Sequence, residues 1–142
     1  MNYPRLSAFI LAFIIVVVGI LGFFDYFAPE GVLFGLFQVN TIHNLIHIIT
    51  GLIGLIAVIP NHRRYAAWYI LEMGVIYALV TILGFVYNGD IFDLAYFNLN
   101  DNLLHAGITI LSFGMSILIL LDRPQEYTGI SLREDPQRMS YR

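Results

Sequence analysis

The chain has 142 residues, room for one domain, and 58% of them are hydrophobic while only 12% are charged. Soluble domains carry about 25% charged residues, so this composition and a mean hydropathy of +0.76 predict an integral membrane protein. The net charge of −3 argues against a nucleic-acid partner, and the absence of cysteine excludes disulfides, thiolate catalysis and cysteine metal sites.

Four apolar runs are close to the roughly 20 helical residues that cross a bilayer. They span residues 6–24, 42–59, 66–87 and 103–121. The first run is expected to be a retained helix, because the following "FDYFAPEG" offers no signal-peptide cleavage site. The runs predict an all-α fold, a four-transmembrane-helix bundle over residues 1–121 with a polar cytoplasmic tail over 122–142.

The arginines predict the orientation of these helices. Arg5 precedes the first helix, Arg63 and Arg64 lie between the second and third, and the other four follow the fourth. The connections 25–41 and 88–102 contain no arginine. By the positive-inside rule both termini are expected in the cytoplasm, and the two Asn-x-x-His motifs are expected on the opposite side of the membrane, which means periplasm, cell surface or thylakoid lumen.

An internal repeat relates the two halves of the chain, about 6–60 and 66–121. "LFGLFQVNTIHNLIH" aligns with "IFDLAYFNLNDNLLH", which pairs Asn44 with Asn102 and His47 with His105. Each half contains two helices, so the repeats are parallel and predict a pseudo-two-fold axis along the membrane normal. The apolar connections before these motifs are expected to be short helices or extended caps at the membrane interface, with their Phe and Tyr side chains in the aromatic belt.

Small and polar residues mark the face on which membrane helices pack. In the second helix this face holds His43, His47, Gly51 and Gly54, and in the fourth it holds His105, Thr109, Ser112 and Ser116. The histidines are therefore expected to point into the bundle rather than toward lipid.

The repeat overlay predicts a metal site at His43, His47, Asp101 and His105, with Asn44 and Asn102 beside it. Three imidazoles and a carboxylate suit a divalent ion such as zinc, or copper. A facing pair such as His47 and His105 also suits a haem iron, and one histidine suits the magnesium of a chlorophyll-type pigment. Two alternatives stay open: the motifs bond neighbouring helices, or they relay protons.

Asparagines next to the helix starts have an ordinary structural explanation. Asn40, Asn98 and Asn100 are each expected to be able to serve as N-caps, because Asn is strongly preferred at that position.

Glu72 and Trp68 lie on the third helix, away from its stripe of small residues, and are expected to contact lipid or a partner subunit. A carboxylate at that depth is costly. The alternative is that Glu72 is protonated or reaches an arginine at the same end of the bundle. His62, in "NHRRY", is expected to be a solvated loop residue.

The segments "LFGLFQVNTIHNLIHIITGLIGL" and "FNLNDNLLHAGITILSFGMSIL" resemble a family of small bacterial and cyanobacterial membrane proteins, domain of unknown function 4383. The resemblance covers most of residues 6–121 and is most specific at the Asn-x-x-His blocks ending at His47 and His105. It implies a four-helix membrane fold and the importance of both blocks, and it implies no chemistry.

No phosphate-binding loop, Ser/His/Asp set or H-E-x-x-H motif is present, so no enzymatic activity is expected. The favoured function is an accessory or structural subunit of a photosynthetic or respiratory membrane complex, in contact with the bilayer and other subunits, with a pigment, haem or metal on the histidines as an option. The alternatives are a stand-alone haem- or metal-binding redox protein and, ranked last, a transporter or channel.

Overall fold

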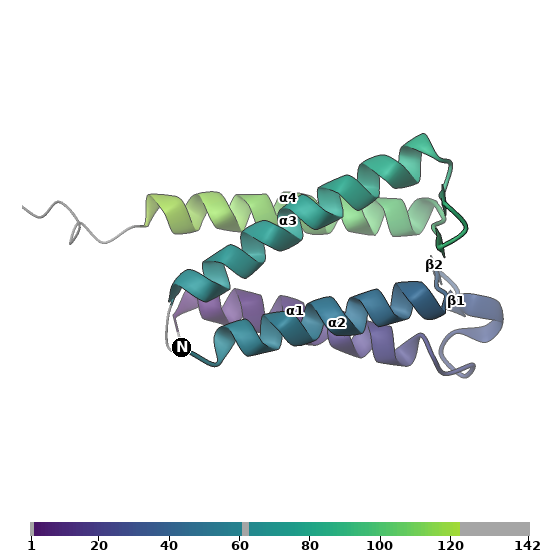
Figure 1. Ribbon diagram of the computed structural model, residues 1–142, viewed down its shortest axis with the longest axis horizontal. Helices are drawn as coiled ribbons and strands as arrows, with labels where there is room; N and C mark the ends of the chain where they lie inside the picture. Colours follow the sequence, from purple (N-terminus) through teal and green to yellow (C-terminus); the bar gives the residue numbers. More distant parts are fainter. Residues whose placement is uncertain (1, 61–62, 123–142) are drawn as a thin grey trace, which may run out of the picture.

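The computed structural model describes residues 2–60 and 63–122, which form four long helices (Figure 1). They are α1 (Tyr3–Leu21), α2 (Thr41–Val58), α3 (Arg63–Val86) and α4 (Leu99–Leu121). All four are long and apolar enough to cross a membrane, as predicted, so the chain is a multi-pass membrane protein of the all-α class. His62 and the tail beyond Asp122 lie outside the described residues.

All four helices begin earlier than their apolar runs, α2 by one residue and the others by three or four. Helix α3 starts at Arg63 and α4 at Leu99, so their polar first turns are also helical. In α4 the side chain of Asn98 accepts a hydrogen bond from the backbone N–H of Asp101, and Asp101 accepts one from Asn98 in return. This capping box satisfies backbone donors that would otherwise lack partners. Asn40 caps α2 by accepting a hydrogen bond from the backbone N–H of His43, so two of the three expected N-caps are confirmed.

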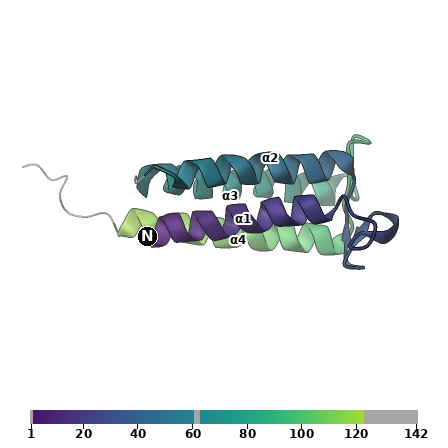
Figure 2. The ribbon, with the colours of Figure 1, turned by 90° about the horizontal axis from the view of Figure 1, so that it is seen from below.

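The helices form two hairpins that lie against each other. Helix α1 runs beside α2, and α3 runs beside α4 but crosses it obliquely (Figure 1). Seen from below, α1 lies over α4 and α2 over α3 (Figure 2). The hydroxyl of Tyr3 donates to the carbonyl oxygen of Leu118 at 3.5 Å, and Ser7 contacts the sulfur of Met115 at 3.8 Å, so α1 also meets α4.

Glycines allow α1 and α2 to approach closely. A Cβ atom added at Gly51 would stand 2.8 Å from the carbonyl oxygen of Ala12, and one added at Gly54 would stand 2.6 Å from the Cβ of Ala12. Small residues at such contacts let the backbones gain dispersion contacts, which drive helix association in a bilayer. The buried apolar residues of α1 and α3, among them Ala8, Ala12 and Ile70, form the core beside this contact.

Each connection at the far end is a short antiparallel β-hairpin. Strand β1 (Val32–Leu33) follows a 3-10 turn, η1 (Pro29–Gly31), and pairs with β2 (Phe37–Gln38). Strand β3 (Asp90–Ile91) pairs with β4 (Ala95–Tyr96). The expected extended caps are therefore hairpins, whose backbone groups are paired where a bare loop would leave them unsatisfied. Beside the second hairpin, the phenol of Tyr96 donates to Asp93 at 2.9 Å, and this hydrogen bond raises the pKa of Tyr96.

The two hairpins exchange reciprocal hydrogen bonds. The amide of Asn40 donates to the carbonyl oxygen of Leu94 at 3.0 Å, and the amide of Asn98 donates to that of Leu36 at 2.8 Å. Asn40 aligns with Asn98 and Leu36 with Leu94 in the repeat. A pseudo-two-fold relation would produce this reciprocity, and the axis itself stays a prediction. Asn100 is not a cap, since its amide also donates to Leu36, at 3.2 Å.

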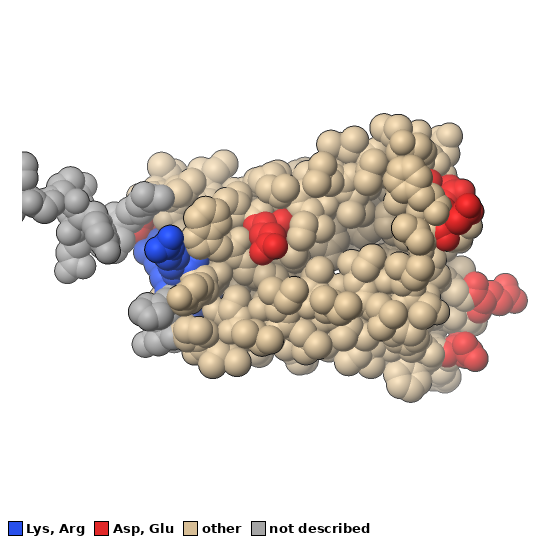
Figure 3. Space-filling view, viewed as in Figure 1, with Lys and Arg blue, Asp and Glu red and all other residues tan. Residues whose placement is uncertain are grey.

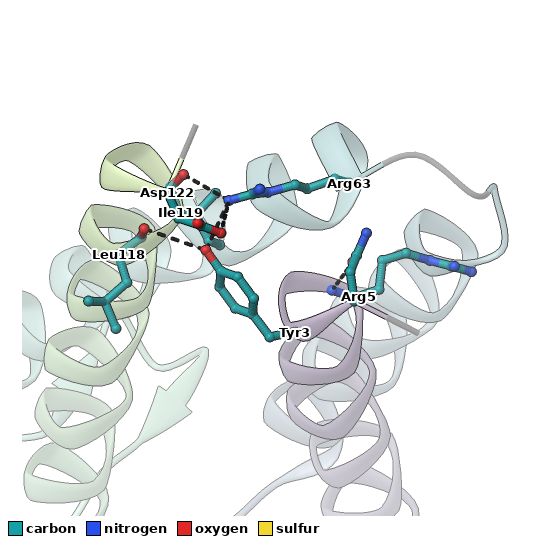
Figure 4. A network of polar contacts seen from close by, with 7 residues as sticks. Tyr3, Arg5, Arg63, Leu118, Ile119 and Asp122 are labelled. Atoms are coloured by element: carbon teal, nitrogen blue, oxygen red, sulfur yellow. Dashed lines mark hydrogen bonds and ion pairs between the residues drawn. The ribbon is translucent and has the colours of Figure 1, made fainter. Parts of the chain in front are cut away.

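Charges separate between the two ends of the bundle. Figure 3 shows the basic side chains at the end where α1 begins and α4 ends, and most acidic side chains at the hairpin end. Arg5 donates to the carbonyl oxygen of Val58 at 2.7 Å. Arg63 donates to the carbonyl oxygen of Ile119 at 3.1 Å and to the carboxylate of Asp122 at 3.0 Å (Figure 4). Both arginines thereby cap helix C-termini, whose last carbonyls lack helical partners.

Candidate metal centre

Three histidines from opposite halves of the chain meet inside the bundle, beneath the hairpins. Helix α2 supplies His43 and His47, and α4 supplies His105. One potential ligand atom from each lies within 4.8 Å of the others. The ring centroid of His43 is 4.4 Å from that of His47 and 5.9 Å from that of His105. His43 is 5% and His105 3% exposed, so both face inward as the helix pattern predicted.

The helix caps fix the depth of two of these ligands. His47 stands six positions after Thr41, the first residue of α2, and His105 stands six positions after Leu99, the first residue of α4. At 1.5 Å per residue each is about 9 Å inside its helix start. The equal depth, predicted from the repeat, brings the two side chains to one level of the bundle.

Each of the three imidazoles has a buried ring nitrogen with no hydrogen-bond partner among the described residues: Nε2 of His43, Nδ1 of His47 and Nδ1 of His105. The other nitrogen of His43, Nδ1, lies 3.2 Å from the carbonyl oxygen of Gln38. A carbonyl can only accept, so Nδ1 carries the proton and Nε2 presents its lone pair. Metal-ligating histidines almost always donate their second N–H to such an acceptor.

A cavity of about 60 Å³ adjoins the three histidines. The remaining lining residues are apolar except for Thr50 and Tyr77, and they come from α2 and α3 together with Ala95 and Phe97. The Phe97 ring lies 5.0 Å from both His43 and His105 between centroids, and closes the cavity toward the hairpins. Drug-sized ligands occupy about 300–1,000 Å³, so a haem or chlorophyll macrocycle does not fit here, whereas an ion with a water molecule does.

Asp101 is not among the clustered ligands. Its Oδ2 accepts the backbone N–H of Gln38 at 2.9 Å and that of Asn98 at 2.8 Å, and the residue is 2% exposed. The peptide groups of Gln38 thus join His43 on one side to Asp101 on the other. The backbone of Gln38 therefore lies between the Asp101 carboxylate and the His43 ring. From this position the negative charge of Asp101 can still offset the charge of a cation bound at the histidines.

Asn44 and Asn102 occupy equivalent places between helices and do not line the cavity. Asn44 is 1% exposed and its side chain fills the space that a Cβ on Gly22 would need. Asn102 fills the same space beside Gly84. The side-chain oxygens of both asparagines are buried without hydrogen-bond partners. The structure therefore places these residues in helix packing, one at each α1–α2 and α3–α4 contact.

Glu72 and Trp68 lie away from the histidine cavity, on the outer face of α3. Trp68 is 58% exposed, and both residues line a separate groove between α2 and α3. No arginine of the described residues forms an ion pair with Glu72, since Arg63 pairs with Asp122 and Arg5 binds Val58.

Several residues of the centre gave no signal in the sequence. Gln38 acts through its backbone, which any residue could supply. Tyr77, whose ring lies 5.2 Å from that of His105, and Met73, which lines the cavity, read as ordinary apolar residues of a membrane helix. Their role depends on the crossing of α3 over the other helices.

The profile of the family described as domain of unknown function 4383 matches residues 5–118. The chain belongs to this family. No curated protein and no solved structure matches it. The membership agrees with the four-helix membrane fold and assigns no reaction, so function has to be argued from the histidines themselves.

Proposed function

We propose that this member of the domain of unknown function 4383 family is a membrane protein that binds one zinc or copper ion at His43, His47 and His105. The observation that supports the proposal is the set of three buried, unpartnered ring nitrogens on three clustered histidines. A buried polar atom without a partner costs about 1–3 kcal/mol, and a metal ion would satisfy all three at once.

The donor set suits these metals. Neutral imidazole binds zinc and copper well, and three protein ligands leave a fourth position for water. Nitrogens bound at 2.0–2.1 Å in a tetrahedral zinc site lie about 3.4 Å apart. The potential ligand atoms of the three histidines lie within 4.8 Å of one another, so the rings have to move closer together when the ion binds. Met73 lines the same cavity, and its thioether is a donor that copper(I) favours.

The role we propose is binding rather than catalysis. No carboxylate lines the cavity within the described residues, so no general base stands beside the fourth position. With both termini in the cytoplasm, the centre would lie near the periplasmic or lumenal surface.

Metal analysis tests the proposal directly. Protein purified in mild detergent through a histidine-free tag, loaded with zinc or copper and then desalted, is expected to retain about one ion per chain. His47→Ala and His105→Ala are expected to retain less than a tenth of that, because two remaining imidazoles bind these ions far more weakly.

His62→Ala is the matched control, because it removes the one histidine outside the cluster. It should retain metal as the parent protein does. Equal retention by all variants, or no retention by the parent protein, would refute the proposed centre.

A second candidate is an accessory subunit of a photosynthetic or respiratory membrane complex. Gly107 and Gly114 of α4, two turns apart, favour it: a Cβ added at either would meet nothing within 4 Å. Small residues on an outward face allow another membrane helix to approach.

Extraction from native membranes tests this candidate. Co-purification with a large complex at fixed stoichiometry, lost in Gly107→Leu, would support it. A protein that migrates alone in mild detergent would not.

A further inference from the structure

The groove between α2 and α3 lies toward the end of the bundle that carries the termini and has a volume of about 430 Å³. Side chains of α2, among them Ile53 and Ile56, form an apolar wall. The wall from α3 is different, because it consists of Tyr65, Trp68, Tyr69 and Glu72. These positions are spaced i, i+3, i+4 and i+7, so they share one helix face.

Glu72 is a charged group on an otherwise uncharged surface. Figure 3 shows one patch of acidic atoms in the middle of the apolar face, over α3, whose only acidic residue is Glu72. The residue stands nine positions after Arg63, about 14 Å into the helix at 1.5 Å per residue. Acidic residues at such depth are expensive and mark functional sites.

Two polar groups of the groove lack a protein partner. Glu72 makes no hydrogen bond or ion pair within the described residues, and Arg64 lies eight positions away on the same helix, about 12 Å along its axis. The hydroxyl of Tyr69 is buried without a partner, although the residue is only 2% exposed. The Glu72 side chain is exposed, so its carboxylate is available to a positively charged group.

The size and the wall of the groove define the class of ligand. A volume of about 430 Å³ is enough for a small molecule, which would lie in an open groove with one side toward the bilayer. Aromatic faces attract organic cations through the ring quadrupole, most strongly at Trp, and the carboxylate supplies the opposite charge. The isoleucines of α2 suit alkyl or aryl substituents.

A helix of another protein fits this groove less well. The glycines of α2 that permit close helix contact, Gly51 and Gly54, face inward and are already used against α1 and Tyr69. Branched side chains, Ile53 and Ile56, face outward beside the groove and hold a second backbone away.

We propose that this groove binds a lipophilic organic cation, an ammonium or phosphonium with apolar substituents, which enters from the bilayer and places its charge between Glu72 and the Trp68 ring. The site is separate from the histidine cavity and does not depend on a bound metal.

Tetraphenylphosphonium is a suitable probe, and Trp68 is the reporter because the chain contains one tryptophan. Titration of the detergent-purified protein is expected to give a saturable change in fluorescence, and equilibrium dialysis of labelled probe a matching affinity. Glu72→Gln should bind at least tenfold more weakly, since removing one charge of such a pair costs more than the 1.4 kcal/mol that a factor of ten represents.

Two controls separate charge recognition from apolar partitioning. Asp25→Asn removes a negative charge at the hairpin end and should bind the probe as the parent protein does. Triphenylphosphine oxide, which is neutral and of similar shape, should bind at least tenfold more weakly than the cation.

The proposal fails if dialysis shows no saturable binding, if Glu72→Gln keeps the parent affinity while unfolding at the parent temperature, or if the neutral compound competes equally. The last result would make the groove an apolar surface for lipid or another membrane helix. None of these outcomes depends on whether the histidines hold metal.

Discussion

At the residue scale, Arg63 completes the end of a helix other than its own. It belongs to the first turn of α3, and one Nη2 atom donates to the hydroxyl of Tyr3, the carbonyl oxygen of Ile119 and the carboxylate of Asp122 (Figure 4). Its guanidinium carbon also lies 5.3 Å from the centroid of the Tyr3 ring. One side chain therefore joins the starts of α1 and α3 to the end of α4.

Arg63→Ala is expected to lower the free energy of unfolding by about 1–3 kcal/mol, because hydrogen bonds to charged groups contribute about that much and the carbonyl oxygen of Ile119 would lose its donor. Denaturation in detergent, followed by circular dichroism, measures the change. Arg64→Ala removes the same charge from the same end and should shift stability by less than about 0.5 kcal/mol. Equal effects of the two variants would attribute the loss to charge alone.

His43 shows how a backbone contact can decide the chemistry of a side chain. The carbonyl oxygen of Gln38 holds the proton of His43 on Nδ1, so Nε2 is ready to ligate. The aligned position in the second half is Asp101, which accepts hydrogen bonds and contributes no ligand to the cluster. The two halves of the repeat therefore differ at this position. The first half supplies a potential metal ligand there, and the second half supplies a hydrogen-bond acceptor.

At the scale of helices, the Asn-x-x-His motif performs two tasks on one helix face. The asparagine packs against a glycine of the preceding helix, Gly22 for Asn44 and Gly84 for Asn102. The histidine three residues later, His47 or His105, reaches the histidine cavity. This contact between asparagine and glycine explains why the repeat has a glycine before each β-hairpin as well as the Asn-x-x-His motif after it.

Gly84→Ala is expected to destabilise the protein by about 1–3 kcal/mol, the usual cost of overpacking, because the new methyl group would collide with the buried side chain of Asn102. Thermal unfolding in detergent measures this. Gly107→Ala is the matched control: its methyl group meets nothing within 4 Å, so it should be neutral or slightly stabilising. A neutral Gly84→Ala would contradict the tight contact.

At the scale of the whole molecule, the centre joins the two halves. His43 and His47 come from the first hairpin of helices and His105 from the second, and Asp101 of α4 binds the backbone of β2. A metal ion held by all three would act as a bridge between α2 and α4.

Zinc is therefore expected to raise the unfolding temperature of the parent protein by several degrees, since a ligand at a hundred times its Kd stabilises by about 2.7 kcal/mol. A chelator should reverse the shift, and His105→Ala, which leaves both ligands on one half, should show none. Thermal scans with and without zinc provide the comparison. A parent protein that retains one ion with an unchanged unfolding temperature would show that the ion does not bridge the halves.

The sequence by itself determined the number of helices, their inward faces and the equal depth of His47 and His105, because apolar length, residue period and the repeat are local properties that the bilayer enforces. It also identified the caps at Asn40 and Asn98, which act within one turn. It could not show whether Asp101 caps α4 and binds the backbone of Gln38 or instead ligates a metal, since a carboxylate can do either.

Only the tertiary structure decided which polar groups meet. The angle at which α3 crosses α4 determines whether Tyr77 and Met73 reach the cavity, and the hairpins determine that the backbone of Gln38 lies between His43 and Asp101. The groove around Glu72 likewise exists because side chains from the end of α2 and the start of α3 face each other across it. Such contacts join residues far apart in the chain, and a periodic pattern along one helix carries no information about the distance to another.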